Sequence, residues 1–192
     1  MFSAQKIYSM LGNESLWEVA NQCNEILSNA SISFSICGGV AVCLHGYQRN
    51  TTDLDLIVRR EDSSRIRSLL LEAGFQWDEV NSEFRTQTGV AIQFLLAGDK
   101  AGRESEVLIA EPLGDLNVEE REGLFVVRLS RLIEMKIACG MSSLRRTHKD
   151  FADVVELIAI RKLDAAFARF LHPTLRDTFR KLVHNATDPE NS

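Results

Sequence analysis

Two short stretches decide the fold: ICGG at residues 36–39 and DLDL at residues 53–56, with thirteen residues, 40–52, between them. A strand that ends in two glycines and enters a helix lets backbone N–H groups approach a phosphate, because no Cβ stands in the way. The start of the helix adds a dipole that favours an anion. The first stretch therefore predicts a phosphate-binding turn.

The second stretch predicts a metal site. Residues two apart in a strand point to the same face, so Asp53 and Asp55 would present their carboxylates side by side, about 7 Å apart along the backbone. Such a pair on an otherwise apolar strand is costly unless cations neutralise it, and hard oxygen ligands select magnesium or calcium. A metal held there could bridge to phosphates lying over Gly38 and Gly39, which is a layout for phosphoryl or nucleotidyl transfer.

Hydrophobic periodicity places both stretches in an α/β order. In chain order, the pattern predicts an amphipathic helix over residues 13–30 that Asn13 could cap, a half-buried strand over 32–36, a short helix over 40–46, a strand over 53–58, a helix from Asp62 or Ser63 to 73, and two strands near 84–86 and 90–96. Each of the first two strands is reached through a helix, so these two strands could be parallel.

The second half of the chain changes character. Residues 113–123 are acidic and loop-like, helical spacing follows over 130–140 and 147–160, and one or two further helices are expected between 164 and about 184. We therefore divide the chain into a core over residues 1–112, which includes the N-terminal helix, and a C-terminal helical region over residues 113–192 that packs on the core.

Composition narrows the class of protein. The chain has 192 residues, of which 45% are apolar and 26% charged, so it can bury a sizeable core. Its net charge of −5 argues against a broad surface for duplex phosphates. The sequence contains no apolar run long enough to span a membrane and no basic leader, so a cytoplasmic location is expected. Four cysteines lack the spacing of a zinc site and are expected to be reduced: Cys23, Cys37, Cys43 and Cys139.

The two stretches together resemble the signature of the nucleotidyltransferase superfamily. That signature is a pair of small residues after a strand, a spacer of about this length, and an Asp-x-Asp or Asp-x-Glu strand. The segment from Arg49 to Thr52 is similar to the Arg-x-Thr-x-Asp lead-in of bacterial members. The resemblance covers roughly residues 30–160.

The resemblance implies a mixed sheet flanked by helices, and transfer of a nucleoside monophosphate from a nucleoside triphosphate to an acceptor with the help of Mg²⁺. It implies catalytic roles for Asp53, Asp55 and Lys136, with the two aspartates as metal ligands. It also implies nucleotide contacts from a further set of residues: Gly38, Gly39, Arg49, Thr51 and Arg146.

Charged residues in the second half resemble the Lys and Arg-x-x-Lys-Asp-x-x-Asp helices of the subgroup that includes abortive-infection toxins. These residues are Lys136, Arg146, Lys149, Asp150 and Asp153. In the functional interpretation, Lys136 and Arg146 face the cleft and contact triphosphate. In the alternative interpretation, they are solvated surface charges, and the aspartates pair with neighbouring cations one turn away.

One position departs from the family pattern. The superfamily carries a third carboxylate on a later strand, and the matching residue here is Gln93. An amide oxygen can ligate a hard cation but brings no charge, and it cannot take a proton at neutral pH. Asp99 is six residues further along and would point to the same face of the strand, but it would lie about 20 Å away, so it is a poor substitute.

Several alternatives stay open at the level of sequence. The acceptor could be RNA, a protein side chain or a small molecule, and the C-terminal helices could hold a protein partner. The chain could also be a catalytically impaired nucleotide-binding or protein-interaction member of the fold. In a purely structural interpretation, the two aspartates would pair with Arg49, Arg59 or Arg60. His45 follows the glycine turn and is interpreted as structural.

Overall fold

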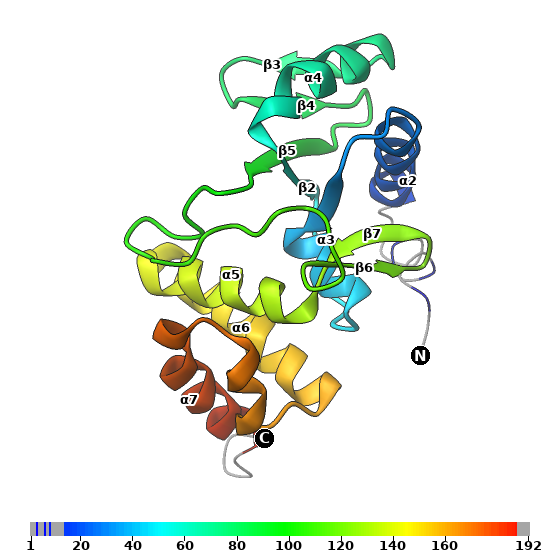
Figure 1. Cartoon of the computed structure of the whole chain (residues 1–192). Helices are drawn as coiled ribbons and strands as arrows, with labels where there is room; N and C mark the ends of the chain where they lie inside the picture. The colour runs from blue at the N-terminus through cyan, green and yellow to red at the C-terminus, as the bar shows by residue number, and fades with distance from the viewer. Residues whose placement is uncertain (1–2, 4–5, 7, 9–13, 188–192) are drawn as a thin grey trace.

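The computed structural model of the chain describes residues 3, 6, 8 and 14–187, so the expected cap at Asn13 lies outside the described residues. These residues form a mixed seven-stranded sheet in the order β3-β4-β5-β2-β1-β7-β6, with helices around it (Figure 1). The expectation of an α/β mixed sheet flanked by helices is confirmed.

The strands are β1 (Phe34–Cys37), β2 (Asp53–Val58), β3 (Gln76–Asp78), β4 (Glu83–Arg85), β5 (Ala91–Leu96), β6 (Val118–Arg121) and β7 (Leu124–Val127). The helices are α2 (Glu14–Asn29), α3 (Gly38–Leu44), α4 (Ser63–Glu72), α5 (Leu129–Ser142), α6 (Leu144–Arg161) and α7 (Arg176–Thr187). Three short 3₁₀ segments are η1 (Arg60–Asp62), η2 (Ala165–Phe170) and η3 (Pro173–Leu175).

The two central strands are antiparallel, with Cys37 opposite Asp55, so the expectation that they are parallel is wrong. The helix between them is short, and six of its seven residues are buried. Helix α3 therefore returns the chain to the end of the sheet where β1 finishes, instead of crossing to the far end as a parallel connection requires. As a result, the glycines and the start of β2 lie at the same end of the sheet.

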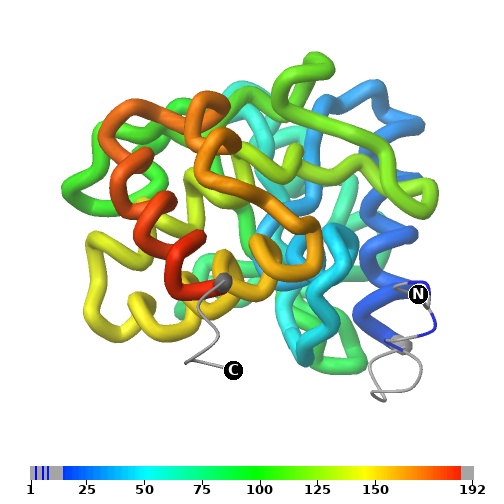
Figure 2. Tube along the Cα trace, turned by 90° about the horizontal axis from the view of Figure 1, so that it is seen from below, coloured from blue at the N-terminus to red at the C-terminus, as the bar shows by residue number. Residues whose placement is uncertain are grey.

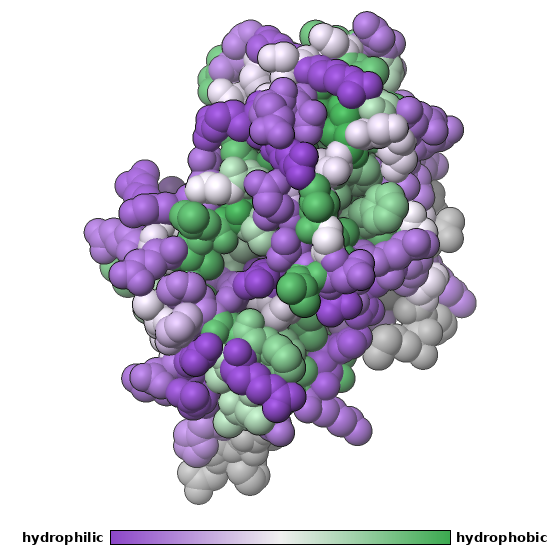
Figure 3. All heavy atoms as spheres, viewed as in Figure 1, coloured by the Kyte–Doolittle hydropathy of each residue, from purple (hydrophilic) through white to green (hydrophobic). Residues whose placement is uncertain are grey.

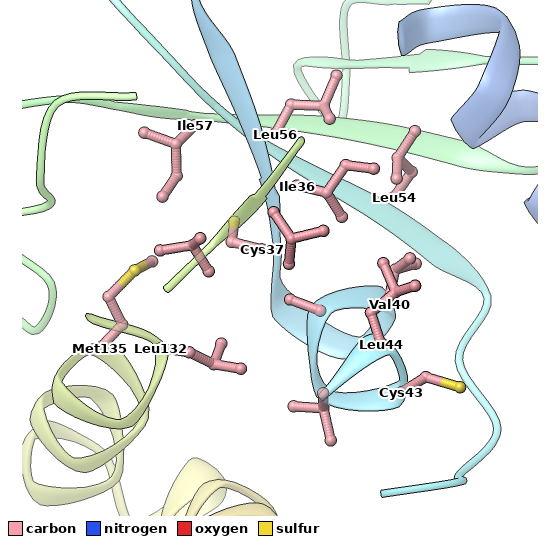
Figure 4. Packing of buried hydrophobic residues seen from close by; sticks show 14 of the residues in the cluster. Ile36, Cys37, Val40, Cys43, Leu44, Leu54, Leu56, Ile57, Leu132 and Met135 are labelled. Carbon is pink, nitrogen blue, oxygen red and sulfur yellow. The ribbon is translucent and has the colours of Figure 1, made fainter. Parts of the chain in front are cut away.

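Hydrophobic residues from β1, β2, α3 and α5 form the centre of the core (Figure 4). Ile57 and Val58 are consecutive in β2 and both are buried. Consecutive strand residues point to opposite faces, so both faces of the sheet are covered here. For the same reason β1 is buried throughout, Ser35 included, and not half-buried as its alternation predicts.

The sequence pattern does not predict three of the strands. Strands β3, β6 and β7 have only three or four residues, which is too short for a clear alternation. The stretch 113–123, expected to be a loop, contains β6, which pairs with β7. Strand β7 in turn pairs in parallel with β1, so the hairpin after residue 112 extends the sheet. The division of the chain at residue 112 stays a prediction.

The C-terminal helices pack against one another below the sheet, as Figures 1 and 2 show. The helices expected over 130–140 and 147–160 are confirmed as α5 and α6. A Cβ on Gly140 would lie 2.5 Å from the ring of Phe151, so glycine lets the two helices approach closely. This close approach brings the inner faces of α5 and α6 together.

The surface in the view of Figure 3 is mostly polar, with separate hydrophobic patches, one of them over the C-terminal helices. A protein partner for these helices stays a prediction. Among the helices of the described residues, none is long and apolar enough to cross a membrane.

His45 fastens the end of α3 to the sheet. Its side chain is fully buried, and Nε2 lies 2.8 Å from the carbonyl oxygen of Val127 in β7, to which it donates. Burial lowers the pKa of His45 to about 4. The imidazole is therefore neutral at pH 7, and its 3.7 Å approach to Glu119 is not an ion pair under that condition. The structural interpretation of His45 agrees with this position.

Acid is expected to destabilise the fold through His45. The folded-state pKa of about 4 lies below the usual 6.5, so the contribution is complete above pH 6.5 and is lost as the pH falls toward 4. Between pH 7.5 and 5 the free energy of unfolding should fall by about 2 kcal/mol from this group. Urea denaturation of the wild type and of His45→Gln at both pH values measures the effect. Equal losses in the two proteins would contradict it.

Candidate active site

The two aspartates lie on one face at the start of β2. Asp53 and Asp55 are half-buried and flank Leu54, which is fully buried and points the other way. The hydroxyl of Thr52 donates to Asp53 Oδ1 at 3.0 Å. The geometric requirement for a shared cation, two carboxylates on the same face, is therefore present.

The paired glycines lie directly against this face. Gly38 has a φ of +60°, and a Cβ built on it would lie 1.7 Å from Oδ2 of Asp55. A Cβ on Gly39 would lie 2.4 Å from the hydroxyl oxygen of Thr51. Both glycines belong to the first turn of α3, and not to the end of β1 as expected. The absence of a side chain at either position is what allows the acid and the lead-in segment to approach the turn.

A buried network of charges lies beside the glycine turn. Lys136 is only 6% exposed, and its Nζ lies 2.8 Å from Asp150 Oδ1 and 2.7 Å from Asp153 Oδ2. Arg49 Nε lies 2.7 Å from Asp153 Oδ1, and Arg146 Nε lies 3.1 Å from Asp150 Oδ2. The interpretation of Lys136 as a solvated residue is wrong, because α6 presents both aspartates to α5. Arg146, 58% exposed, remains open to solvent.

Arg49 links this network to the glycine turn. Its Nη2 would lie 3.2 Å from a Cβ on Gly39. The alternative in which Arg49 pairs with Asp53 is wrong, because its guanidinium pairs with Asp153 of α6 instead. The lead-in segment before β2 and the C-terminal helices are thus joined by an ion pair at the edge of the site. Contacts of Arg49, Lys136 and Arg146 with phosphate stay predictions.

The electrostatics of Asp55 favour a bound cation. Burial raises the pKa of Asp55 above its usual value, Lys136 lowers it, and the charge of Asp53 raises it again. Arg146 and Lys149 lower it further, yet the net shift is upward. The surrounding cations therefore do not fully compensate the ionised carboxylate in its half-buried position.

Gln93 lies beside Asp55, on the face of the sheet that carries the two aspartates. Strand β5 runs parallel to β2 with Gln93 in register with Asp55, so the two side chains share a face. The amide Nε2 of Gln93 donates to Glu83 Oε2 at 2.9 Å. Asp99 lies beyond the end of β5 and pairs with Arg60 at 2.7 Å, so it does not replace the missing acid.

The residues present suit one magnesium ion. Within the described part of the chain, no three His, Cys, Asp or Glu side chains are placed to hold a metal. Mg²⁺ is commonly held by one or two carboxylates together with water and substrate phosphates. The carboxylates of Asp53 and Asp55, with the amide oxygen of Gln93 on the neighbouring strand, match that donor set.

The purely structural interpretation of the two aspartates does not hold. The arginines proposed as their partners pair with other acids: Arg49 with Asp153, Arg59 with Glu111 at 2.9 Å, and Arg60 with Asp99 at 2.7 Å.

A surface cavity of about 630 Å³ exists elsewhere, at the Phe34 end of β1, and neither aspartate lines it.

Sequence reasoning missed Glu83 altogether. It is buried in β4, a strand whose register against β5 pairs Phe84 with Ile92 and so places Glu83 opposite Gln93. The available signal was an acid at the start of the predicted strand near 84–86. That signal becomes informative only when the register of the hairpin is known.

A match to a family model identifies the family of the chain. The model for aminoglycoside-2''-adenylyltransferases matches residues 20–140, which is more than half of the chain. The match includes the glycine turn at residues 36–39 and the acidic strand at residues 53–56. The chain belongs to this family. It is therefore a member of the nucleotidyltransferase superfamily, as the resemblance indicated, and a transferase. Among curated protein sequences, none matches the chain.

The chain resembles several solved structures, and the first of these supports the same fold. A candidate nucleotidyltransferase from Thermotoga maritima is 16% identical, with 72% of this chain and 93% of that chain covered and a TM-score of 0.51. JHP933 from Helicobacter pylori is 16% identical over 90% of this chain and 76% of that one, with a TM-score of 0.49. ANT(2'')-Ia in complex with adenylyl-2''-tobramycin is 12% identical over 92% and 91%, with a TM-score of 0.44. The likeness to abortive-infection toxins stays a prediction.

Gly38→Ala tests the packing of the acid against the turn. The new Cβ would overlap the Asp55 carboxylate, and the alanine would have to keep the positive φ of residue 38. We therefore expect a loss of stability. Gly114→Ala is the matched control, because Gly114 has a φ of +84° but no atom within 4 Å of the position that a methyl group would take. By urea denaturation, Gly38→Ala should lose about 1–3 kcal/mol more than the control. Equal losses would show that the acid does not pack there.

Asp55→Asn is expected to stabilise the metal-free protein. Because the folded-state pKa of Asp55 is raised, its ionisation penalises the fold at neutral pH, and the penalty is absent below the usual value of 3.8. We expect the melting temperature at pH 7.5 to rise, because the substitution removes the uncompensated charge and keeps the shape of the side chain. The gain should vanish near pH 3. Asp177→Asn, at an acid 88% exposed on α7, is the control. An unchanged or lower melting temperature for Asp55→Asn would contradict this.

Proposed function

We propose that the chain transfers a nucleoside monophosphate from a nucleoside triphosphate to a hydroxyl group of an acceptor, assisted by one Mg²⁺. One observation carries the proposal: Asp53 and Asp55 share a face of β2, and the Asp55 carboxylate lies against the backbone of Gly38. Membership of the adenylyltransferase family supports the class of reaction.

The residues around the glycine turn would have separate roles in metal and phosphate binding. Asp53 and Asp55 would hold the magnesium ion, which when bound neutralises phosphate charge and polarises the phosphoryl oxygens. The bare backbone of Gly38 and Gly39 would accommodate the triphosphate. Nucleotide contacts are assigned to Arg49, Thr51 and Arg146, and a catalytic phosphate contact to Lys136, whose ammonium keeps one N–H beyond its two aspartate partners.

The transfer itself is a displacement at the α-phosphorus. The acceptor oxygen forms a bond to the α-phosphorus, the bond from that phosphorus to the bridging oxygen breaks, and pyrophosphate leaves with the electron pair. The proton of the acceptor hydroxyl must pass to a base or to water. Gln93 cannot receive it, because an amide is not basic at neutral pH.

For the acceptor, we propose an amino-substituted sugar of the aminoglycoside class. The family description names this class, and such compounds are polycations with several hydroxyls. The net charge of −5 favours the approach of a cationic acceptor and disfavours a large nucleic acid. RNA and protein acceptors are tested in parallel.

A second candidate function follows from Gln93: nucleotide binding with impaired turnover. The amide removes one anionic ligand and one base from the site. The amide Nε2 of Gln93 donates a hydrogen bond to Glu83, and this contact is compatible with either function.

Labelled nucleotides distinguish the two functions. The protein is incubated with Mg²⁺ and each of the four α-labelled nucleoside triphosphates, with aminoglycosides, RNA or protein extract as acceptor. Label transfer and pyrophosphate release are measured. We expect transfer that falls at least about 100-fold in Asp53→Asn and in Asp55→Asn, because both carboxylates would hold the Mg²⁺ ion that neutralises the reacting phosphates. Asp177→Asn should react like the wild type.

Other outcomes have definite meanings. Transfer that appears only in Gln93→Asp would establish the second function. Calorimetry with nucleotide and Mg²⁺ that detects no binding to the wild type would refute both.

A further inference from the structure

Glu83 is a buried acid beside the proposed site that the reaction described above does not use. It is 4% exposed and lies at the start of β4, directly opposite Gln93 of β5. One carboxylate oxygen accepts a hydrogen bond from Gln93 Nε2 at 2.9 Å, and the other pairs with the guanidinium of Arg85. One oxygen of Glu83 therefore has a hydrogen-bond partner, and the other has an ion-pair partner.

This contact determines which end of the Gln93 amide faces Glu83. An ionised carboxylate only accepts hydrogen bonds, whereas an amide has a donor end and an acceptor end. The NH₂ group must therefore face Glu83, since the opposite orientation would set the amide oxygen against a carboxylate oxygen. The amide oxygen Oε1 is left for other partners.

The other neighbour of Gln93 across the sheet is the metal site. Gln93 is in register with Asp55 on one side and opposite Glu83 on the other, and paired residues in adjacent strands share a face. The three side chains thus form a row across β2, β5 and β4. In this row, the amide of Gln93 lies between Asp55, which would hold the cation, and Glu83, which would not.

We propose that Glu83 is a positioning residue, which orients Gln93 so that the amide presents its oxygen, and not its NH₂ group, to the cation beside Asp55. The inference rests on the proposed function. An unrestrained amide would present its donor end about as readily as its acceptor end, and a donor repels a cation. Glu83 therefore lets a neutral residue act as an oxygen ligand.

Glu83→Gln tests the orientation. The new amide can donate or accept, so it no longer selects one orientation of Gln93. Binding of Mg²⁺ in the presence of a non-hydrolysable nucleoside triphosphate is measured by calorimetry. We expect the affinity for Mg²⁺ to fall at least about twofold, because an amide with two equally populated orientations presents its oxygen to the cation only half of the time. Glu79→Gln, the same change at an acid 78% exposed near the same hairpin, should bind like the wild type.

The exchanged pair tests whether residue 93 contacts the cation. In Glu83→Gln with Gln93→Glu, residue 93 has an oxygen at both ends, so its orientation no longer matters, and the new amide at 83 can donate to it. We expect Mg²⁺ affinity to return to the wild-type level or above. Because the carboxylate at position 93 also adds a negative charge beside the cation, recovery shows that residue 93 contacts the cation, and the fall in Glu83→Gln remains the test of orientation.

The outcomes are distinct. Wild-type affinity in Glu83→Gln, or no recovery in the exchanged pair, overturns the role of Glu83 and leaves the proposed function intact. Failure of the wild type to bind Mg²⁺ with nucleotide overturns the proposed function, and this inference with it. If Glu83→Gln does not fold, NMR of the wild type decides: side-chain amide protons of Gln93 that exchange as fast as those of free glutamine would overturn the proposal.

Discussion

The site depends on one steric constraint, the contact between the Asp55 carboxylate and the backbone of Gly38. Antiparallel pairing of β1 with β2 sets Cys37 opposite Asp55, so the next residue after Cys37 meets the acid itself. The carboxylate fills the volume that a side chain at position 38 would need. Register, helix start and acid are therefore fixed together, and a shift of one residue between the strands would turn both aspartates to the other face.

A second constraint connects the C-terminal helices to the site. Lys136 and Arg49 share Asp153, and Lys136 also contacts Asp150, all with little exposure to water. Buried ion pairs add modest net stability, but removal of one member leaves an uncompensated charge and is costly. The helices α5 and α6 are thus held to the segment that precedes β2, and the charges near the glycine turn are fixed before any ligand arrives.

Residues with local signatures were predictable, and residues that depend on tertiary pairing were not. The spacing from Gly38 to Asp55 is local and led to the correct superfamily, and the periodicity of α5 and α6 is local and led to two helices that the structure confirms. The direction of β1 relative to β2 was not predictable, because it depends on where α3 packs. Lys136 looks like an ordinary surface charge in sequence, since the acids that bury it belong to the next helix. Glu83 acquires meaning only through the register of β4 against β5.

The two ends of the open sheet bear on how the protein behaves at high concentration. The outermost strands, β3 and β6, have three and four residues, and β6 carries the charged sequence VEER. Short edges offer few backbone hydrogen bonds to a strand of another molecule, and the charges of β6 further disfavour such pairing. The pairing-competent, apolar strands are confined to the middle of the sheet, which protects the chain against edge-to-edge aggregation.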